Sequence, residues 1–155
     1  MLTPKLTTKA ACRIARIDRD RFNEHVAAGH FGCAPDTTPG RARLFDPDDM
    51  IALYLFRELM DDGLNARRAG SIACAVALAA RLSPDSKTIT YVQDYFGPDS
   101  GKAFPTSAVP APDTWDTATL SGTDVRKSTT FNILKMRALI ARYTEEERSI
   151  IGEDD

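Results

Sequence analysis

A group of polar side chains between residues 19 and 25 has the types and the spacing for hydrogen bonds to another molecule. Arg19, Arg21, Asn23 and His25 stand at alternate positions of the stretch RDRFNEH. An arginine guanidinium can donate two parallel hydrogen bonds to a guanine base, which contributes about 1–3 kcal/mol of discrimination against another base. These four residues are therefore candidates for contacts with double-stranded DNA.

A second pair of arginines, Arg41 and Arg43, lies in the stretch GRARLF. Successive side chains of a β-strand point to opposite faces, so two residues at this spacing project to the same face. Arginines on one side of a hairpin edge can reach DNA phosphates or a minor groove. Lys9, which lies earlier in the chain, is a candidate for positioning the DNA backbone.

The chain has 155 residues and a formal net charge of −2, but its charges are unevenly distributed. Residues 1–45 hold eight Lys or Arg against four acids, whereas residues 46–64 hold one basic residue and six acids. Residues 65–82 are basic again and include Arg67 and Arg68. Because phosphate contacts require positive charge, we expect any DNA-binding surface within the first 45 residues, with help from these two arginines.

The sequence does not indicate an enzyme, a metal site or a cofactor site. It shows no Ser-His-Asp or Cys-His grouping and no glycine-rich phosphate loop after a strand. His25, His30 and Cys33 are too few and too loosely spaced for structural zinc, which normally takes four ligands at paired spacing. Since Cys12, Cys33 and Cys74 are odd in number and far apart, we expect buried reduced thiols rather than a disulfide framework.

Membrane and export signals are also not indicated. The chain contains no apolar run approaching the roughly 20 residues that a membrane span needs. Residues 1–9 lack the apolar centre of a secretion signal. We therefore expect a cytoplasmic protein with no membrane partner.

Two short helices separated by a tight turn are expected in the stretch LTTKAACRIARIDRDRFNEHVAAG. Thr7 or Thr8 can cap the first helix, and Asp18 can cap the second, because side-chain oxygens accept hydrogen bonds from the unpaired amides of a first turn. The second helix is expected over about Arg19–Ala28, with Phe22 pointing inward. This order is that of a helix-turn-helix, whose second helix enters the major groove.

The stretch HFGCAPDTTPGRARLF predicts a short hairpin, because apolar residues flank a cluster rich in Pro, Asp, Thr and Gly. A hairpin beside a helix-turn-helix is a wing, and this one would carry Arg41 and Arg43. Asp46 then caps a third helix over about 47–62, with proline at its first position. A fourth helix is expected over about 65–82.

From residue 84 onward the pattern changes to short β-rich segments and a final helix. Strands are expected at 87–97, 114–120 and 127–131, and a long irregular loop at 98–112. Asn132 can cap the final helix, whose apolar stripe is Met136, Leu139, Ile140 and Tyr143. The expected fold is therefore mainly α with small β (α+β).

The order helix, turn, helix, hairpin, helix, helix over about residues 6–82 resembles the DNA-binding domain of the MerR family of transcription regulators. The resemblance is carried by Ile17 and Asp18 at the turn, by Phe22, and by the segments AAGHF, RLF, DPDDMIAL and DDGLNARRAGSI. RLFDPDD is the most specific of these. The resemblance implies a winged helix-turn-helix over residues 1–83, followed by a small strand-and-helix unit over residues 84–155.

The function that the resemblance implies is sequence-specific transcriptional regulation, with Arg19–Ala28 as the recognition helix and Arg41 and Arg43 on the DNA backbone or minor groove. The chain departs from the family at His25, where an aromatic residue usually contacts phosphate, and at Asn23, where an arginine is usual. No cysteine follows Cys74, whereas the metal sensors of the family carry cysteines around a C-terminal coiled coil. The resemblance therefore implies no effector.

A module this small and only modestly basic is expected to bind DNA weakly as a monomer, which predicts a homodimer on an inverted repeat. The final helix can supply the dimer contact, as the C-terminal region does in the family, or it can cover the chain's own small sheet. Two other functions stay open: a phage or mobile-element DNA-binding adaptor of excisionase or packaging type, and a protein-interaction module. Paired wing arginines favour the DNA-binding functions.

Overall fold

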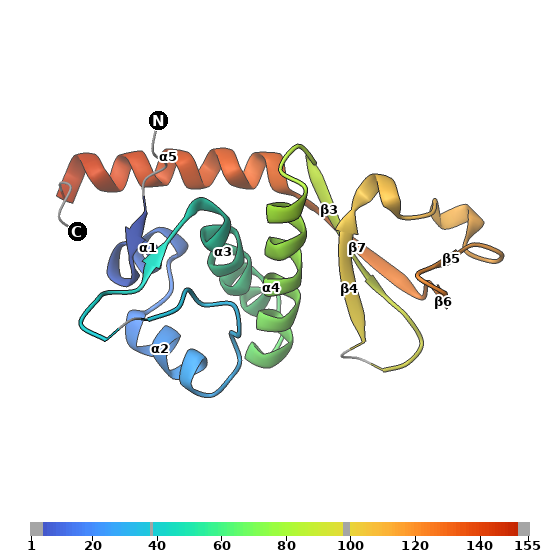
Figure 1. Ribbon diagram of the computed structural model, residues 1–155, viewed down its shortest axis with the longest axis horizontal. Coiled ribbons are helices and arrows are strands. Elements are labelled where there is room, and N and C mark those ends of the chain that lie inside the picture. Colours follow the sequence, from blue (N-terminus) through green and yellow to red (C-terminus); the bar gives the residue numbers. More distant parts are fainter. Residues whose placement is uncertain (1–4, 38, 98–99, 152–155) are drawn as a thin grey trace.

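The computed structural model describes residues 5–37, 39–97 and 100–151 and has an α+β architecture (Figure 1). Helices are grouped at one end of the molecule, and an antiparallel sheet projects from the other end. The elements of the first half are β1 (Leu6–Thr7), α1 (Thr8–Ala15), α2 (Arg19–Ala27), β2 (Leu44–Phe45), α3 (Pro47–Asp61) and α4 (Ala66–Leu82). Among the described residues, no helix combines the length and the apolar character that crossing a membrane requires.

The four helices of the first half begin where the sequence predicts. At each start the capping side chain accepts a hydrogen bond from a backbone amide three positions on, and the caps are Thr7, Asp18, Asp46 and Asn65. At α3 the bond is reciprocal, because Asp49 also accepts from the Asp46 amide at 2.9 Å. Local capping chemistry therefore confirms the expected helix order.

The expected hairpin between α2 and β2 is wrong. Of the described residues in this segment, only Leu44 and Phe45 form a strand, and they pair antiparallel with β1, so that Leu6 lies opposite Phe45. Both of these side chains are buried against the helices. Residues 32–43 lack the alternating apolar side chains that would give a hairpin a buried face. The segment is irregular for that reason.

The sheet of the second half has the order β4-β3-β7, built from β3 (Thr88–Gln93), β4 (Gly101–Pro105) and β7 (Lys127–Asn132). Two of these strands, β3 and β7, confirm the prediction. The long loop expected at 98–112 is wrong, because β4 lies within it, although Pro98 and Asp99 are outside the described residues. In β4 the Tyr91 ring lies over Gly101: a Cβ there would lie 2.2 Å from the Tyr91 hydroxyl oxygen, so a larger residue would displace that ring.

The connection from β4 to β7 contains two 3₁₀ turns and a second small antiparallel pair of strands. These elements are η1 (Thr106–Ala108), η2 (Pro112–Thr114), β5 (Thr119–Leu120) and β6 (Thr123–Asp124). The prediction of a strand over 114–120 is therefore wrong, except at Thr119 and Leu120, which form β5. Trp115 donates its indole N–H to the Pro110 carbonyl at 2.8 Å, which stabilises a turn at that place.

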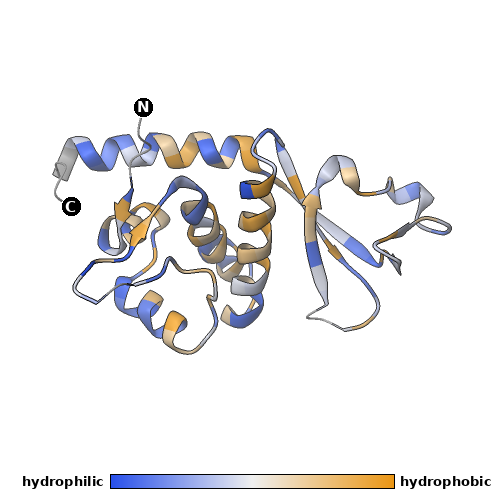
Figure 2. Ribbon diagram, in the orientation of Figure 1, coloured by the Kyte–Doolittle hydropathy of each residue, from blue (hydrophilic) through white to orange (hydrophobic). Residues whose placement is uncertain are grey.

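The final helix, α5 (Ile133–Ile151), follows β7 directly and runs back along α1 and α3 (Figure 1). The Asn132 side chain accepts from the Lys135 amide at 3.1 Å, which confirms the predicted cap. Met136 and Ile140 join the core formed by the other helices, and Figure 2 shows the apolar segments of α4 and α5. Met136 and Ile140 of the stripe thus pack on the N-terminal helices, whereas Leu139 and Tyr143 are half-buried. A dimer contact through α5 stays a prediction. The domain boundary at residue 83 stays a prediction.

Candidate nucleic-acid interface

Helix α2 is fixed to the core by one aromatic side chain. Phe22 is 0% exposed, and its ring lies 5.4 Å from Phe31 and 5.9 Å from Phe45 between centroids. The opposite side of the helix faces solvent and carries the exposed Asp20 and Glu24. Arg21 and Asn23 are exposed on the two flanks of the helix, and Arg19 is exposed in its first turn. Exposed donors on a helix that is fixed to the core can reach base edges.

The turn between α1 and α2 brings Lys9 and Arg19 together. Both line a hollow of about 460 Å³ that lies at the start of α2 and also includes Asp18 and Asp20. Lys9 and Arg19 are exposed, so their charged groups are accessible to a phosphate. Two predicted site residues from different helices therefore meet at one concave surface.

Arg16 also belongs to this turn, and the sequence did not single it out. Arg16 is the C-cap residue of α1 and adopts a left-handed conformation with φ 59°. Its side chain is exposed. Its amide donates to the Arg13 carbonyl at 3.2 Å. A non-glycine residue with positive φ is uncommon, and a left-handed residue often ends a helix, as Arg16 ends α1. An arginine in a stretch of helical pattern gives no sign of this conformation.

His25 lies on the inner flank of α2. Its ring meets Phe56 edge-on at 5.3 Å between centroids, and its Nδ1 lies 3.2 Å from the Nδ1 of His30. Burial and then the neighbouring His30 lower the pKa of His25 below its ordinary value. The side chain is therefore half-buried beside the core, so its access to DNA is more limited than that of the three residues before it.

The two arginines of the expected wing lie in the irregular segment before β2. Arg41 is exposed, whereas Arg43 is half-buried and donates from Nη1 to the Pro35 carbonyl at 2.6 Å. The strand that would have directed both side chains to one face is not formed, so that reason for grouping them is wrong. Arg43 holds two parts of the segment together, and Arg41 is accessible.

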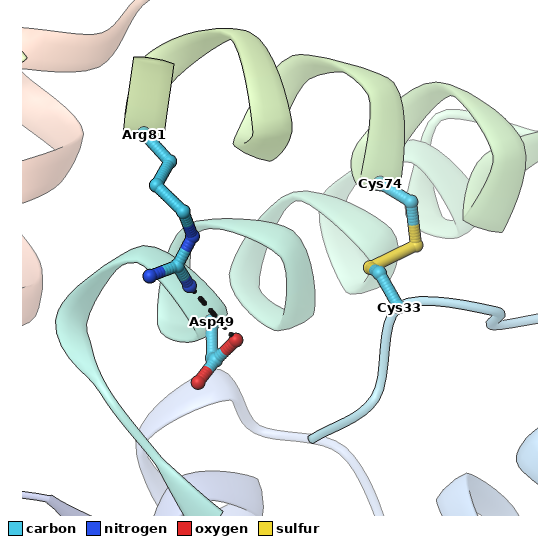
Figure 3. Close-up of a disulfide and its surroundings, with 4 residues drawn as sticks. All are labelled: Cys33, Asp49, Cys74 and Arg81. Atoms are coloured by element: carbon cyan, nitrogen blue, oxygen red, sulfur yellow. Dashed lines mark hydrogen bonds and ion pairs between the residues drawn. A yellow bond between two sulfur atoms is a disulfide. The ribbon is translucent and has the colours of Figure 1, made fainter. Parts of the chain in front are cut away.

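A disulfide joins Cys33, in the segment after α2, to Cys74 of α4 (Figure 3). The expectation of reduced thiols at these positions is wrong: their Cα atoms are 5.6 Å apart although 41 positions separate them in sequence. The pairing depends on how the segment lies on α4, which spacing in the sequence does not reveal. Cys12 is the buried free thiol that was expected, and burial raises its pKa to about 11.

A network of ion pairs fixes the start of α3 to the end of α4 and to the first turns of α5. Arg81 donates to Asp46 at 2.9 Å and to Asp49 at 3.1 Å, and the second pair is drawn in Figure 3. Arg137 of α5 pairs with Asp48 at 2.7 Å. Burial alone would raise the pKa of Asp46, but hydrogen bonds from Arg81 and the Asp49 amide hold that pKa below its ordinary value. These arginines stabilise helix packing and are engaged in it.

The rest of the molecule leaves the outer side of α2 uncovered. Figure 1 shows α2 and α5 on opposite sides of the helical part. On the α5 side Arg13 forms an ion pair with Glu147, so this arginine is engaged away from α2. Within the described part of the chain, no group of three or more His, Cys, Asp or Glu side chains is placed to hold a metal ion.

Known proteins give no family assignment. No family model matches the chain, and no curated protein matches it.

Proposed function

We propose that this protein is a sequence-specific double-stranded DNA-binding transcriptional regulator of a MerR-like helix-turn-helix type, in which an irregular segment stands where the family has a wing. In this function α2 lies in the major groove and its exposed residues contact base edges. The observation that carries the proposal is that Phe22 anchors α2 to the core while the donor side chains of Arg19, Arg21 and Asn23 stay exposed. Lys9 adds a further exposed charge where it lines a hollow together with Arg19.

The contacts divide by chemistry. Arg21 and Asn23, exposed on α2, can each form two hydrogen bonds with a purine, so they carry sequence discrimination. Lys9 and Arg19, beside the hollow, neutralise phosphates and fix the register of the helix. Arg41, exposed in the segment before β2, reaches the DNA backbone or the minor groove.

Binding as a homodimer on an inverted repeat is part of the proposal, because one module with few basic contacts binds weakly at cellular salt. Met136 and Ile140 are buried within the chain, so a dimer contact through α5 would use the side chains that remain exposed or half-buried, such as Leu134. Sedimentation velocity at micromolar concentration, with and without DNA, tests it. A species with one chain under both conditions would contradict this part of the proposal.

The experiment that tests DNA binding starts with selection of bound DNA from a random pool, followed by affinity measurements on the selected fragment. Arg21→Ala should reduce affinity by the equivalent of about 1–3 kcal/mol and relax preference at one base pair. Lys9→Ala should weaken binding to all sequences, and it should reduce the slope of log affinity against log salt concentration by about one, the value expected for one phosphate contact.

Arg142→Ala is the matched control, because Arg142 is an exposed arginine of α5, on the far side of the helical part from α2. It should leave both affinity and preference unchanged. Equal losses from Arg21→Ala and Arg142→Ala would show that nonspecific charge accounts for binding and would refute the role of α2.

A DNA-binding adaptor of the phage or mobile-element type is the second candidate. It is favoured by two adjacent exposed aromatic side chains beyond β3, Tyr95 at 69% and Phe96 at 79% exposure, since exposed aromatic residues are typical of protein contact surfaces. Transcription in a purified system distinguishes the two functions. A regulator changes the yield from a promoter that contains the selected sequence, whereas an adaptor binds that sequence without changing the yield.

A further inference from the structure

The Cys33–Cys74 disulfide connects the segment that follows the proposed recognition helix to a helix of the core. Cys33 lies six residues after the end of α2, and Cys74 lies in the middle of α4. Figure 3 shows the bond bridging from the chain that carries Cys33 to the side of α4. The segment is thus held on α4 by a covalent bond that chemistry can break.

The two ends of the segment are held independently of this bond. At its start Phe31 is buried beside Phe56, with ring centroids 5.0 Å apart, and at its end β2 pairs with β1. Between these ends, residues 32–43 are half-buried or exposed wherever the structure describes them, and they include Arg41. Loss of the disulfide would therefore loosen the middle of the segment while α2 and β2 stay in place.

Both sulfur-bearing residues are half-buried rather than sealed in the core. A cleft of about 120 Å³ is lined by both cysteines and extends past Leu78 to Arg81. A small thiol can approach a disulfide at such a position. The third cysteine does not compete, because Cys12 is buried and its raised pKa keeps it protonated and unreactive at neutral pH.

We propose that Cys33 and Cys74 form a thiol–disulfide exchange site that sets the affinity of the protein for DNA, with a small-molecule thiol as its co-reactant. The inference rests on the proposed function. Proteins that act on DNA in the cytoplasm meet a reducing pool of thiols, and disulfides there are usually transient and redox-sensing. The Cys33–Cys74 disulfide is half-buried and lies outside the central core, as a redox-sensing disulfide needs to be in order to react with a small thiol.

The exchange is balanced as follows. A thiolate of the small molecule attacks one of the two sulfurs, the Cys33–Cys74 bond breaks, and a mixed disulfide forms while the released cysteine thiolate takes a proton. A second small thiol attacks the mixed disulfide, which releases the small-molecule disulfide and the other cysteine as a thiol. Two electrons pass from two small thiols to the protein, and the reverse reaction oxidises it again.

The oxidised protein is the form that binds DNA more tightly. With the bond in place, the segment that carries Arg41 is already ordered on α4, so less conformational freedom is lost when DNA binds. Ordering a mobile segment on binding costs free energy for each side chain immobilised, which corresponds here to about threefold to tenfold in affinity. Reduction should therefore raise Kd by that factor without changing the preferred sequence, because α2 keeps its anchor.

The experiment measures the Kd of the full chain for the selected DNA fragment by fluorescence anisotropy, first oxidised and then after treatment with dithiothreitol. Alkylation and mass spectrometry verify the state of Cys33 and Cys74 in each sample. Wild-type protein should bind about threefold to tenfold more weakly after reduction. Cys33→Ser with Cys74→Ser should show the weaker Kd with and without dithiothreitol, and reduced, alkylated wild type serves as a second form if the variant does not fold.

The outcomes separate the two proposals. DNA binding with the same Kd in both states, or with a tighter Kd after reduction, overturns the exchange site as a control of affinity and leaves the proposed function standing. No binding in either state refutes the proposed function, and the inference falls with it. A disulfide that resists dithiothreitol in the folded protein also overturns the inference.

Discussion

Gly70 and the backbone of His30 are in direct contact: a Cβ added at Gly70 would lie 1.7 Å from the His30 carbonyl oxygen. The chain that leaves α2 therefore rests on the backbone of α4 at a point where only glycine fits. Cys74 lies one helical turn further along α4, so the close approach and the disulfide fix neighbouring parts of the same segment. Glycine at residue 70 thus determines where the segment after α2 lies.

Gly70→Ala should destabilise the protein by about 1–3 kcal/mol, because the new methyl group forces the His30 backbone away from α4. The direction is diagnostic, since the same change inside a helix normally stabilises by up to about 1 kcal/mol. Urea unfolding followed by circular dichroism measures the difference. Ser71→Ala, at the next and exposed position of α4, is the control and should change stability little. A neutral or stabilising Gly70→Ala would contradict the close contact.

Removal of the disulfide should lower the free energy of unfolding by about 4 kcal/mol, because the bond closes a loop between residues 41 positions apart. Chemical denaturation of oxidised wild type, compared with the Cys33→Ser, Cys74→Ser double variant, measures the loss. Dithiothreitol should reduce the stability of the wild type and leave that of the double variant unchanged. Equal stability of oxidised wild type and the double variant would show that the bond does not form.

Arg137→Ala should loosen α5 from the helices beneath it. Arg137 donates to Asp48 at 2.7 Å and to the Ala80 carbonyl at 3.1 Å, so the substitution removes the partner of a half-buried carboxylate and of a backbone oxygen. We expect a loss of about 1–2 kcal/mol in stability. Compared with wild type, the variant should show a larger increase in amide hydrogen exchange in α5 than in α4. Arg142→Ala removes an exposed pair with Glu146 and surface contacts with Tyr143, and it should cost less than Arg137→Ala.

The protein should become less stable as the pH falls below 6.5. In the folded state the pKa of His25 is lowered from its ordinary value of 6.5, so the unfolded chain binds the proton more readily than the folded one. The contribution of neutral His25 is present above pH 6.5 and is lost as the pH falls through the lower folded value. Thermal unfolding between pH 7.5 and about pH 5 should show a steeper decline for wild type than for His25→Gln. Parallel declines would contradict the assignment.

Local chemistry accounts for what the sequence predicted. Helix starts at Asp18, Asp46 and Asn65 depend on a side chain and an amide three residues on, so the sequence contains all the information they need. The exposure of Arg21 and Asn23 follows from the position of Phe22 on the same helix, because helical periodicity turns residues next to Phe22 away from its buried side. Arg19 is exposed as the first residue of the helix. The candidate residues on α2 could therefore be placed, all but His25.

Apart from the left-handed Arg16, the main features that sequence reasoning missed depend on residues far apart in the chain. The partner of Phe45 is Leu6, which only the folded chain brings near. Cys33 meets Cys74 because Gly70 lets the segment lie close, and the inward position of His25 depends on Phe56 of α3. None of these pairs leaves a periodic or spaced pattern, so a single sequence cannot reveal them.

The return of α5 over the helical part affects how the protein can be divided. A shortened protein that ended at residue 83 would lack Ile133, Met136 and Ile140, which are buried against the other helices in the intact chain. Their loss would widen the apolar hollow that Leu6, Phe45 and Met50 line, between the β1–β2 pair and the start of α3. Fragments that expose such an apolar surface tend to self-associate. Dissection of this molecule should therefore retain the last helix, even where only the first half is of interest.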